Sequence, residues 1–126
     1  MLSETDSEGA RRLRDDFHAA SHELIAPDIF PVECLHALLK AERQKRVIGG
    51  LPLWQAIMVD APVLVPHIPL LARAAEIASA ARIGVYDCVY VALAEQDGCE
   101  LVTADAKLVA SLRATFPFIR ALSSMP

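Results

Sequence analysis

The residues of this sequence best placed to share chemistry are three carboxylates, Glu33, Asp87 and Asp105. Carboxylate oxygens are natural ligands for Mg²⁺ or Mn²⁺, with the remaining coordination positions taken by water and a substrate phosphate. Carboxylates gathered in the absence of a cation repel one another, so at least one of them should have a raised pKa. The three acids therefore predict a divalent-metal site, provided that the fold brings them together.

Asp87 lies near the start of a helix predicted over residues 86–96, and its position allows two interpretations. Tyr90, Val91 and Ala94 follow it on the same helical face, so the carboxylate is expected to face inward, where it would need a charged or metal partner. Acidic residues at a helix start also cap the helix and interact favourably with its dipole. Taken alone, the position slightly favours the cap.

Glu33 and Asp105 have structural alternatives of the same kind. Glu33 lies on a predicted helix with Lys40 on the same face, where the two could form a weak surface pair. Asp105 follows an apolar run and precedes a predicted helix, so it could serve only as the N-cap. The metal site is favoured because all three acids are placed to meet at one end of a sheet.

The elements that must position these acids alternate along the chain. Apolar spacing and Gly or Pro punctuation predict helices over 4–20, 29–45 (with Asp28 as N-cap), 51–61, 69–82, 86–96 and 106–115, and strands over 23–27, 63–68, 99–103 and 118–121. A proline inside 63–68 makes that strand short or places it at an edge. Such alternation predicts a parallel sheet between helices, with the ligand site at the carboxyl ends of the strands. The loop carrying Asp105 should therefore open onto the site.

Length and composition limit the classes of protein to which this chain can belong. The 126 residues suit one domain, 54% are hydrophobic with a mean hydropathy of +0.35, and no apolar run reaches the ~18 residues of a membrane span. The polar N-terminus carries no signal peptide, so a soluble, cytoplasmic protein is expected.

Three cysteines without a CxxC motif favour buried, reduced thiols over a disulfide or zinc site. A net charge of −4 argues against a general nucleic-acid coat, but not against a nuclease whose acids are offset by cations.

Three segments resemble successive blocks of a PIN domain, in particular the toxin component of VapBC-type toxin–antitoxin modules. They are residues 23–45 (ELIAPDIFPVECLHALLKAERQK), 86–96 (YDCVYVALAEQ) and 99–108 (CELVTADAKL). The resemblance covers nearly the whole chain, and YDCVYVALAE and LVTADAKL are its most diagnostic parts. It implies a three-layer α/β/α fold with a central, mainly parallel sheet, and Mg²⁺- or Mn²⁺-dependent hydrolysis of single-stranded RNA.

The resemblance also implies roles for residues and partners. Glu33, Asp87 and Asp105 match acids that bind the metal and activate water, and Thr103 matches a hydroxyl residue near the metal that could contact substrate. Domains that this chain resembles usually form homodimers. They are held inactive by a small antitoxin whose tail crosses the active-site groove.

The N-terminus departs from the family pattern. The family begins with a short apolar strand that ends in an aspartate, whereas MLSETDSEGARRL resembles the family segment that comes after that strand. The first strand and its aspartate therefore have no counterpart, and Asp6 is not assigned the role. Loss of a central strand would expose two strand edges. Two interpretations stay open: a metal-dependent endoribonuclease whose strand is encoded upstream of Met1, or a non-catalytic interaction module that keeps the fold.

Overall fold

Helices and strands alternate along the part of the chain that the computed structural model describes, residues 24–124. The strands are β1 (Ile25–Pro27), β2 (Val63–Val65), β3 (Leu101–Thr103) and β4 (Ile119–Ala121); the helices are α2 (Phe30–Arg43), α3 (Gly50–Val59), α4 (Leu71–Ala81), α5 (Val85–Asp97) and α6 (Ala106–Leu112), with short 3-10 helices η1 (Ile68–Leu70) and η2 (Leu122–Ser124). The predicted α/β class is confirmed, and each strand is shorter than predicted. The helix predicted over 4–20 lies outside the described residues.

The strands pair in parallel, as predicted, in two separate two-stranded sheets. β1 pairs with β2 and β3 pairs with β4, with Ile25 opposite Val63 and Leu101 opposite Ile119. Within residues 24–124 no ladder joins the two pairs, but α5 contacts both β1 and β3. Helix α5 is therefore the element through which the two pairs meet.

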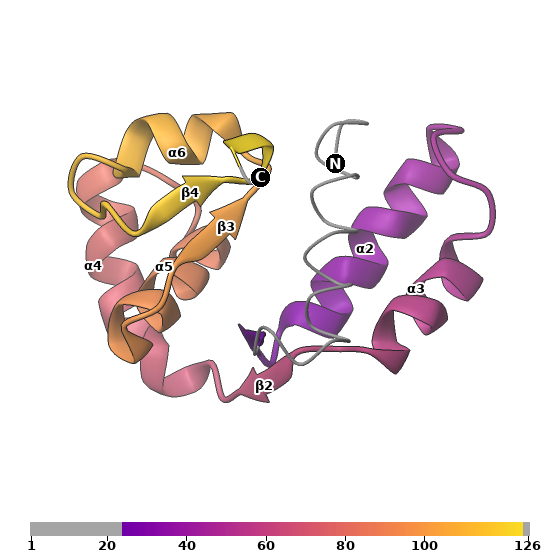
Figure 1. The fold of residues 1–126 in the computed structure, drawn as a ribbon, viewed down its shortest axis with the longest axis horizontal. Coiled ribbons are helices and arrows are strands. Elements are labelled where there is room, and N and C mark those ends of the chain that lie inside the picture. The colour runs from indigo at the N-terminus through magenta and orange to yellow at the C-terminus, as the bar shows by residue number, and fades with distance from the viewer. Residues whose placement is uncertain (1–23, 125–126) are drawn as a thin grey trace.

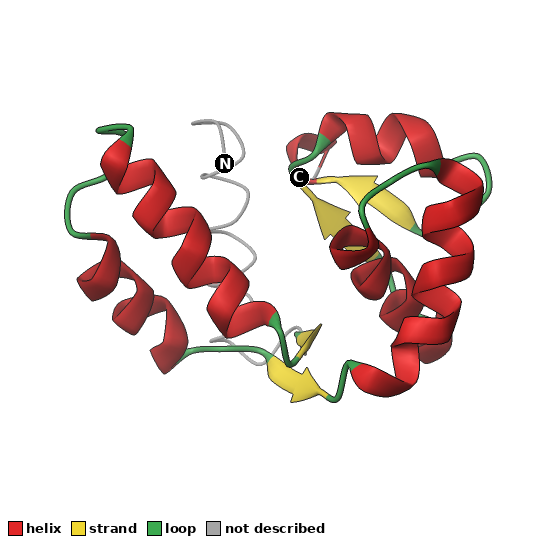
Figure 2. Ribbon diagram, turned by 180° about the vertical axis from the view of Figure 1, so that it is seen from behind, coloured by secondary structure: helices red, strands yellow, loops and turns green. Residues whose placement is uncertain are grey.

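The two views of the ribbon agree on how these units are arranged. Helices α2 and α3 lie side by side on one side of the molecule, and α4, α5 and α6 gather around β3 and β4 on the other (Figure 1). Figure 2 shows the same division from behind, with the strands β1 and β2 at the junction between the two groups. The chain crosses from one group to the other just after β2.

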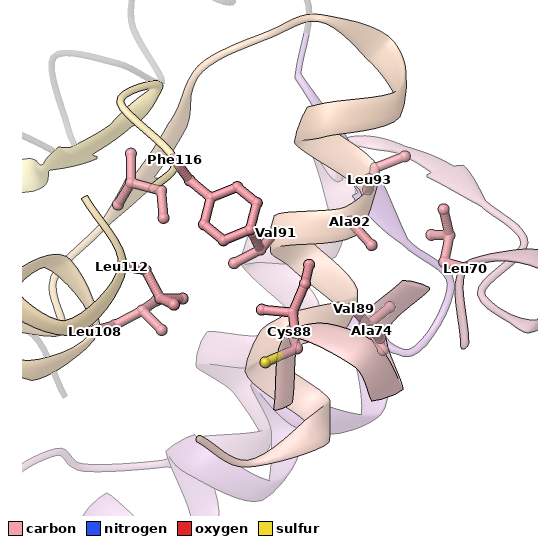
Figure 3. Close-up of a cluster of buried hydrophobic side chains, with 12 residues drawn as sticks. Leu70, Ala74, Cys88, Val89, Val91, Ala92, Leu93, Leu108, Leu112 and Phe116 are labelled. Atoms are coloured by element: carbon pink, nitrogen blue, oxygen red, sulfur yellow. The ribbon is translucent and has the colours of Figure 1, made fainter. Parts of the chain in front are cut away.

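The hydrophobic core surrounds α5. This helix is apolar almost all round, which favours burial on every side, and its residues 88, 89 and 91–94 are all buried. Figure 3 shows Leu70 and Ala74 packed on one part of α5, and Leu108, Leu112 and Phe116 on another. Among the described residues no single helix is long and apolar enough to cross a membrane; the bent pair Ile68–Ala81 and Val85–Asp97, at 118°, passes that test by length and composition only.

Helix α3 is held against α2 by a close backbone approach and two hydrogen bonds. A Cβ on Gly50 would lie 3.1 Å from the carbonyl oxygen of Leu38, so a side chain there would push the helices apart. The Gly50 amide donates to Glu42 Oε1 at 2.7 Å, and Trp54 Nε1 donates to the Pro31 carbonyl oxygen at 2.8 Å. Trp54 thus serves the packing of α3 against α2.

The prediction that Asp28 caps α2 is wrong. The N-cap residue is Ile29, and no side chain caps the helix. Asp28 instead accepts a hydrogen bond from the His67 amide at 3.1 Å and contacts the His67 ring nitrogen Nδ1. The reason is the parallel pairing of β1 with β2, which brings the residues after the two strands together.

Truncating a core isoleucine should destabilise the protein far more than truncating an exposed one. Ile119 in β4 is fully buried, whereas Ile48 is 99% exposed in the α2–α3 connection. We expect Ile119→Ala to lower the free energy of unfolding by about 2–5 kcal/mol, through lost burial and a residual cavity. The matched Ile48→Ala should change it by less than about 0.5 kcal/mol. Urea unfolding measures both, and equal effects would contradict the core assignment.

Candidate active site

Asp105 lies at the carboxyl end of β3, where the sequence places it, and it caps α6. Its Oδ1 accepts hydrogen bonds from the amides of Lys107 at 3.0 Å and Leu108 at 3.1 Å, while its own amide donates to Thr103 Oγ1 at 3.1 Å. Asp105 therefore serves as the N-cap of α6, as the structural alternative predicted. Both cap bonds use Oδ1, so Oδ2 of the same carboxylate is the atom that could take another ligand.

Asp87 lies in the first turn of α5, and the prediction that it faces inward is wrong. Its side chain is exposed, whereas Val91 and Ala94 of the same face are buried. The difference arises because the helix begins in an exposed segment and enters the core only after its first turn. The cap alternative is not observed either, since Gly84 is the N-cap residue and no side chain caps the helix.

A hollow of about 270 Å³ lies beside β3. Asp87 and Tyr90 of α5 line it together with residues 101–104 and Leu108. Partial burial at its mouth raises the pKa of Asp87, and the negative charge of Asp105 raises it further. The two carboxylates are thus close enough to repel each other, which matches the raised pKa expected for clustered acids.

Glu33 is attached to this region through Tyr90, a residue to which the sequence alone gave no role at the site. The Tyr90 hydroxyl donates to Glu33 Oε1 at 2.7 Å, so this carboxylate is turned towards α5. Burial raises the pKa of Tyr90, and its bond to Glu33 adds to the effect, so the hydroxyl keeps its proton near neutral pH. The signal that could have found it is spacing, because Tyr90 follows Asp87 by three residues on one face.

Two of the three carboxylates, Asp87 and Asp105, suit a divalent cation such as Mg²⁺. Across residues 24–124 no group of three or more His, Cys, Asp or Glu side chains is arranged to hold a metal ion, so Glu33 does not complete a cage with Asp87 and Asp105. Mg²⁺, however, commonly binds through one or two carboxylates, with water and substrate phosphate as its other ligands. Asp87 and Asp105 are the residues that would hold such an ion, whose positive charge would offset their mutual repulsion.

The cysteines are placed as structural thiols. All three are free; Cys88 is buried, and Cys34 and Cys99 are half-buried. Burial raises the pKa of each thiol, which keeps the nucleophilic thiolate scarce. None of the three is therefore suited to nucleophilic chemistry.

Two substitutions of Asp105 should separate its role as the N-cap of α6 from the effect of its negative charge on Asp87. Asparagine is as good an N-cap as aspartate, so Asp105→Asn should preserve stability, while Asp105→Ala should cost about 0.5–2 kcal/mol. Both remove the negative charge, so both should lower the pKa of Asp87 towards its ordinary value, with the contribution from burial remaining. Carboxyl-carbon NMR titration measures this shift. An unchanged Asp87 pKa in both variants would show that the two acids do not interact.

Comparison with known proteins finds one matching family. The sequence matches the PIN domain family over residues 2–111, a span that includes Glu33, Asp87 and Asp105. No curated protein and no solved structure shows a significant match to the chain. PIN domains are generally nucleases, and their nucleases generally use divalent metal ions. Since the match covers most of the sequence and the fold is the mixed α/β fold that it implies, the chain belongs to the PIN domain family.

Proposed function

We propose that this chain is a Mg²⁺- or Mn²⁺-dependent endoribonuclease that cleaves single-stranded RNA, as the toxin of a toxin–antitoxin module. The observation that carries the proposal is the placement of two acids beside β3, with Asp87 lining the hollow and Asp105 following the strand as the N-cap of α6. Membership of a family of nucleases supports hydrolysis of a nucleic acid. The resemblance of YDCVYVALAE and LVTADAKL to VapBC-type toxins supports RNA as the substrate.

In this proposal each side chain has a distinct task. Asp87, which lines the hollow, and Asp105, which caps α6, would hold the cation. Glu33 on α2, bonded to Tyr90, is the third acid of the proposal but does not share their position. A bound divalent ion would polarise the scissile phosphate and lower the pKa of the attacking water. Thr103 holds the turn before Asp105 through its Oγ1 and lines the hollow, where its hydroxyl can contact the RNA backbone.

A second candidate function is a non-catalytic interaction module with the same fold. It is favoured by the finding that, within the described part of the chain, three acids are not assembled around a common metal position. A protein of this kind would bind a partner through its surface without needing a cation. The two functions predict different binding of Mn²⁺, because only the nuclease requires a metal site.

The proposal extends to partners and compartment. We propose a cytoplasmic homodimer that a small antitoxin inhibits. The sequence offers an apolar stripe on α2, made of Leu35, Leu38 and Leu39, as a surface for association. The stripe is unsuitable, because Leu38 is buried and the other two residues are half-buried. Exposed apolar side chains lie instead on and after α3, including Val59 at 81% and Ile68 at 70%. Apolar side chains left in solvent favour association.

Replacing Asp87 by asparagine should abolish metal-dependent cleavage of single-stranded RNA. The change keeps the shape of the side chain but removes the charge that holds the cation, so we expect a loss of at least about 100-fold. The matched control is Asp97→Asn, at the far end of the same helix, which should cleave like the parent. Cleavage of a labelled RNA under Mg²⁺ or Mn²⁺ is the measurement.

The same proteins distinguish the two candidate functions. Isothermal titration with Mn²⁺ should show binding by the parent and by Asp97→Asn, with weaker binding by Asp87→Asn. A parent chain that neither binds Mn²⁺ nor cleaves RNA would favour the interaction module. Cleavage by Asp87→Asn at the parental rate would contradict the assignment of the site.

Light scattering tests the proposed assembly. We expect a particle of twice the 13.7 kDa chain mass, because a domain of this size leaves several large apolar side chains in water. A basic-tailed small protein encoded beside the gene should bind the dimer and block cleavage. A monodisperse monomer at high protein concentration, with no such neighbouring gene, would contradict this part of the proposal.

A further inference from the structure

The connection between α2 and α3 begins with a dense group of positive charges. Lys40 and Arg43 lie in the last turn of α2, and Lys45 and Arg46 follow that helix. The structure describes nine Lys and Arg residues, so four of the nine fall within seven consecutive positions, and all four are exposed. We call these four residues the basic tip. It lies at the end of α2 that is remote from β1 (Figure 1).

The basic tip is positively charged within an acidic protein. Residues 34–59 contain its four cations and one acid, Glu42, whereas the rest of the chain has eight Lys and Arg against fifteen Asp and Glu. Arg73 and Arg120 are each paired with a glutamate, but within residues 24–124 no cation of the basic tip forms an ion pair. Four unpaired cations in a molecule of net charge −4 form a surface that attracts a polyanion, while the acidic remainder repels it.

The stability of α2 accounts for only two of these cations. Lys40 and Arg43 lie in the last turn, where positive charge interacts favourably with the helix dipole. Lys45 and Arg46 lie beyond the helix, and their amides donate to the carbonyl oxygens of Glu42 and Ala41 at 3.0 and 2.9 Å. These are the backbone hydrogen bonds of a Schellman motif, which closes a helix without any charged side chain. The charges of Lys45 and Arg46 therefore do not serve to end the helix.

Lys45 also occupies a backbone position that favours glycine. Its φ is +59°, in the left-handed region, and it is the first residue after the C-cap Gln44. Helices usually place Gly or Asn there, because a Cβ is disfavoured at positive φ. A side chain that is kept in a disfavoured backbone conformation points to a function for that side chain. The distinctive group of this side chain is its exposed ammonium.

The positive charges continue along the face of α2 that carries Glu33. Lys40 and Arg43 follow Glu33 by seven and ten residues, which places all three on one side of the helix. The Tyr90 hydroxyl on α5 donates to Glu33, so this face of α2 begins against α5. A rise of 1.5 Å per residue puts Arg43 about 15 Å along α2 from Glu33. An extended polyanion bound at the basic tip can therefore run along α2 towards α5.

We propose that the basic tip binds the phosphate backbone of single-stranded RNA, at a distance from the acids that would cleave it. The inference rests on RNA as the substrate in the proposed function, and not on the metal. Lys and Arg bind phosphates of any sequence, so the basic tip adds affinity without selecting bases. It also offsets the repulsion between RNA and the acidic remainder of the chain.

The test is binding of a labelled single-stranded RNA to the full chain, measured by fluorescence anisotropy in EDTA so that no cleavage occurs. Lys45→Gly and Arg46→Gln are made singly and together, and we expect the Kd at about 50 mM salt to rise roughly 5- to 10-fold for each cation removed. The slope of log Kd against log salt concentration should fall by about 0.7 per cation. Arg113→Gln is the matched control, because Arg113 is an exposed cation at the end of α6, and its Kd should equal that of the parent.

Lys45→Gly also separates RNA binding from stability. Glycine is favoured at a φ of +59°, so this variant should unfold at a higher urea concentration than the parent while it binds RNA more weakly. Weaker binding together with a lower urea midpoint would indicate a structural defect, and that result would overturn the proposal. In cleavage assays Arg46→Gln should raise the KM for RNA and keep the parental kcat, because the basic tip does not touch the scissile phosphate.

The outcomes separate this inference from the proposed function. If the parent cleaves RNA but the Lys45 and Arg46 variants bind it like Arg113→Gln, the basic tip is overturned and the nuclease stands. If those variants weaken RNA binding but the parent cleaves no RNA under Mg²⁺ or Mn²⁺, the basic tip stands and the nuclease is overturned. A parent that binds vesicles of phosphatidylserine and phosphatidylcholine but not RNA overturns both, because the anionic partner is then a membrane surface.

Discussion

Burial of α5 on nearly all sides determines where the other elements lie. Val89, Val91 and Leu93 are each at most 3% exposed, and the helix contacts α4, β1 and β3. Both ends of the helix escape this burial: residues 85–87 and 95–97 are exposed, so Asp87 remains in contact with solvent while it lines the hollow. The helix thus acts as a rigid support for a charged group that could not itself be buried without a large desolvation cost.

Electrostatic repulsion at the site is tolerable because the acids stay near water. Asp87 and Asp105 are both exposed, so solvent screens much of their repulsion. Partial burial raises the pKa of Asp87, and the charge of Asp105 adds to that effect. Full burial of the same pair would demand protonation or a permanent cation.

Local sequence patterns predicted the features that depend on neighbouring residues. The alternation of helices and strands, and Asp105 at the end of β3, follow from apolar spacing and from residues typical of turns. Asp28 and Tyr90 were not assigned their partners, because those partners are 39 and 57 residues away and depend on how strands and helices assemble. The exposure of Asp87 was missed because helical periodicity gives the face of a residue but not the depth at which the helix enters the core.

The two parallel strand pairs enclose chain segments of very different length. Pairing of β1 with β2 brings together Asp28 and His67, 39 residues apart, whereas pairing of β3 with β4 brings together Glu100 and Arg120, 20 residues apart. Closing a flexible loop costs roughly 0.6 kcal/mol more entropy for each doubling of its length. Asp105 lies inside the short loop and Glu33 inside the long one. The chain therefore loses more conformational freedom in closing the strand pair that flanks Glu33 than in closing the pair that flanks Asp105.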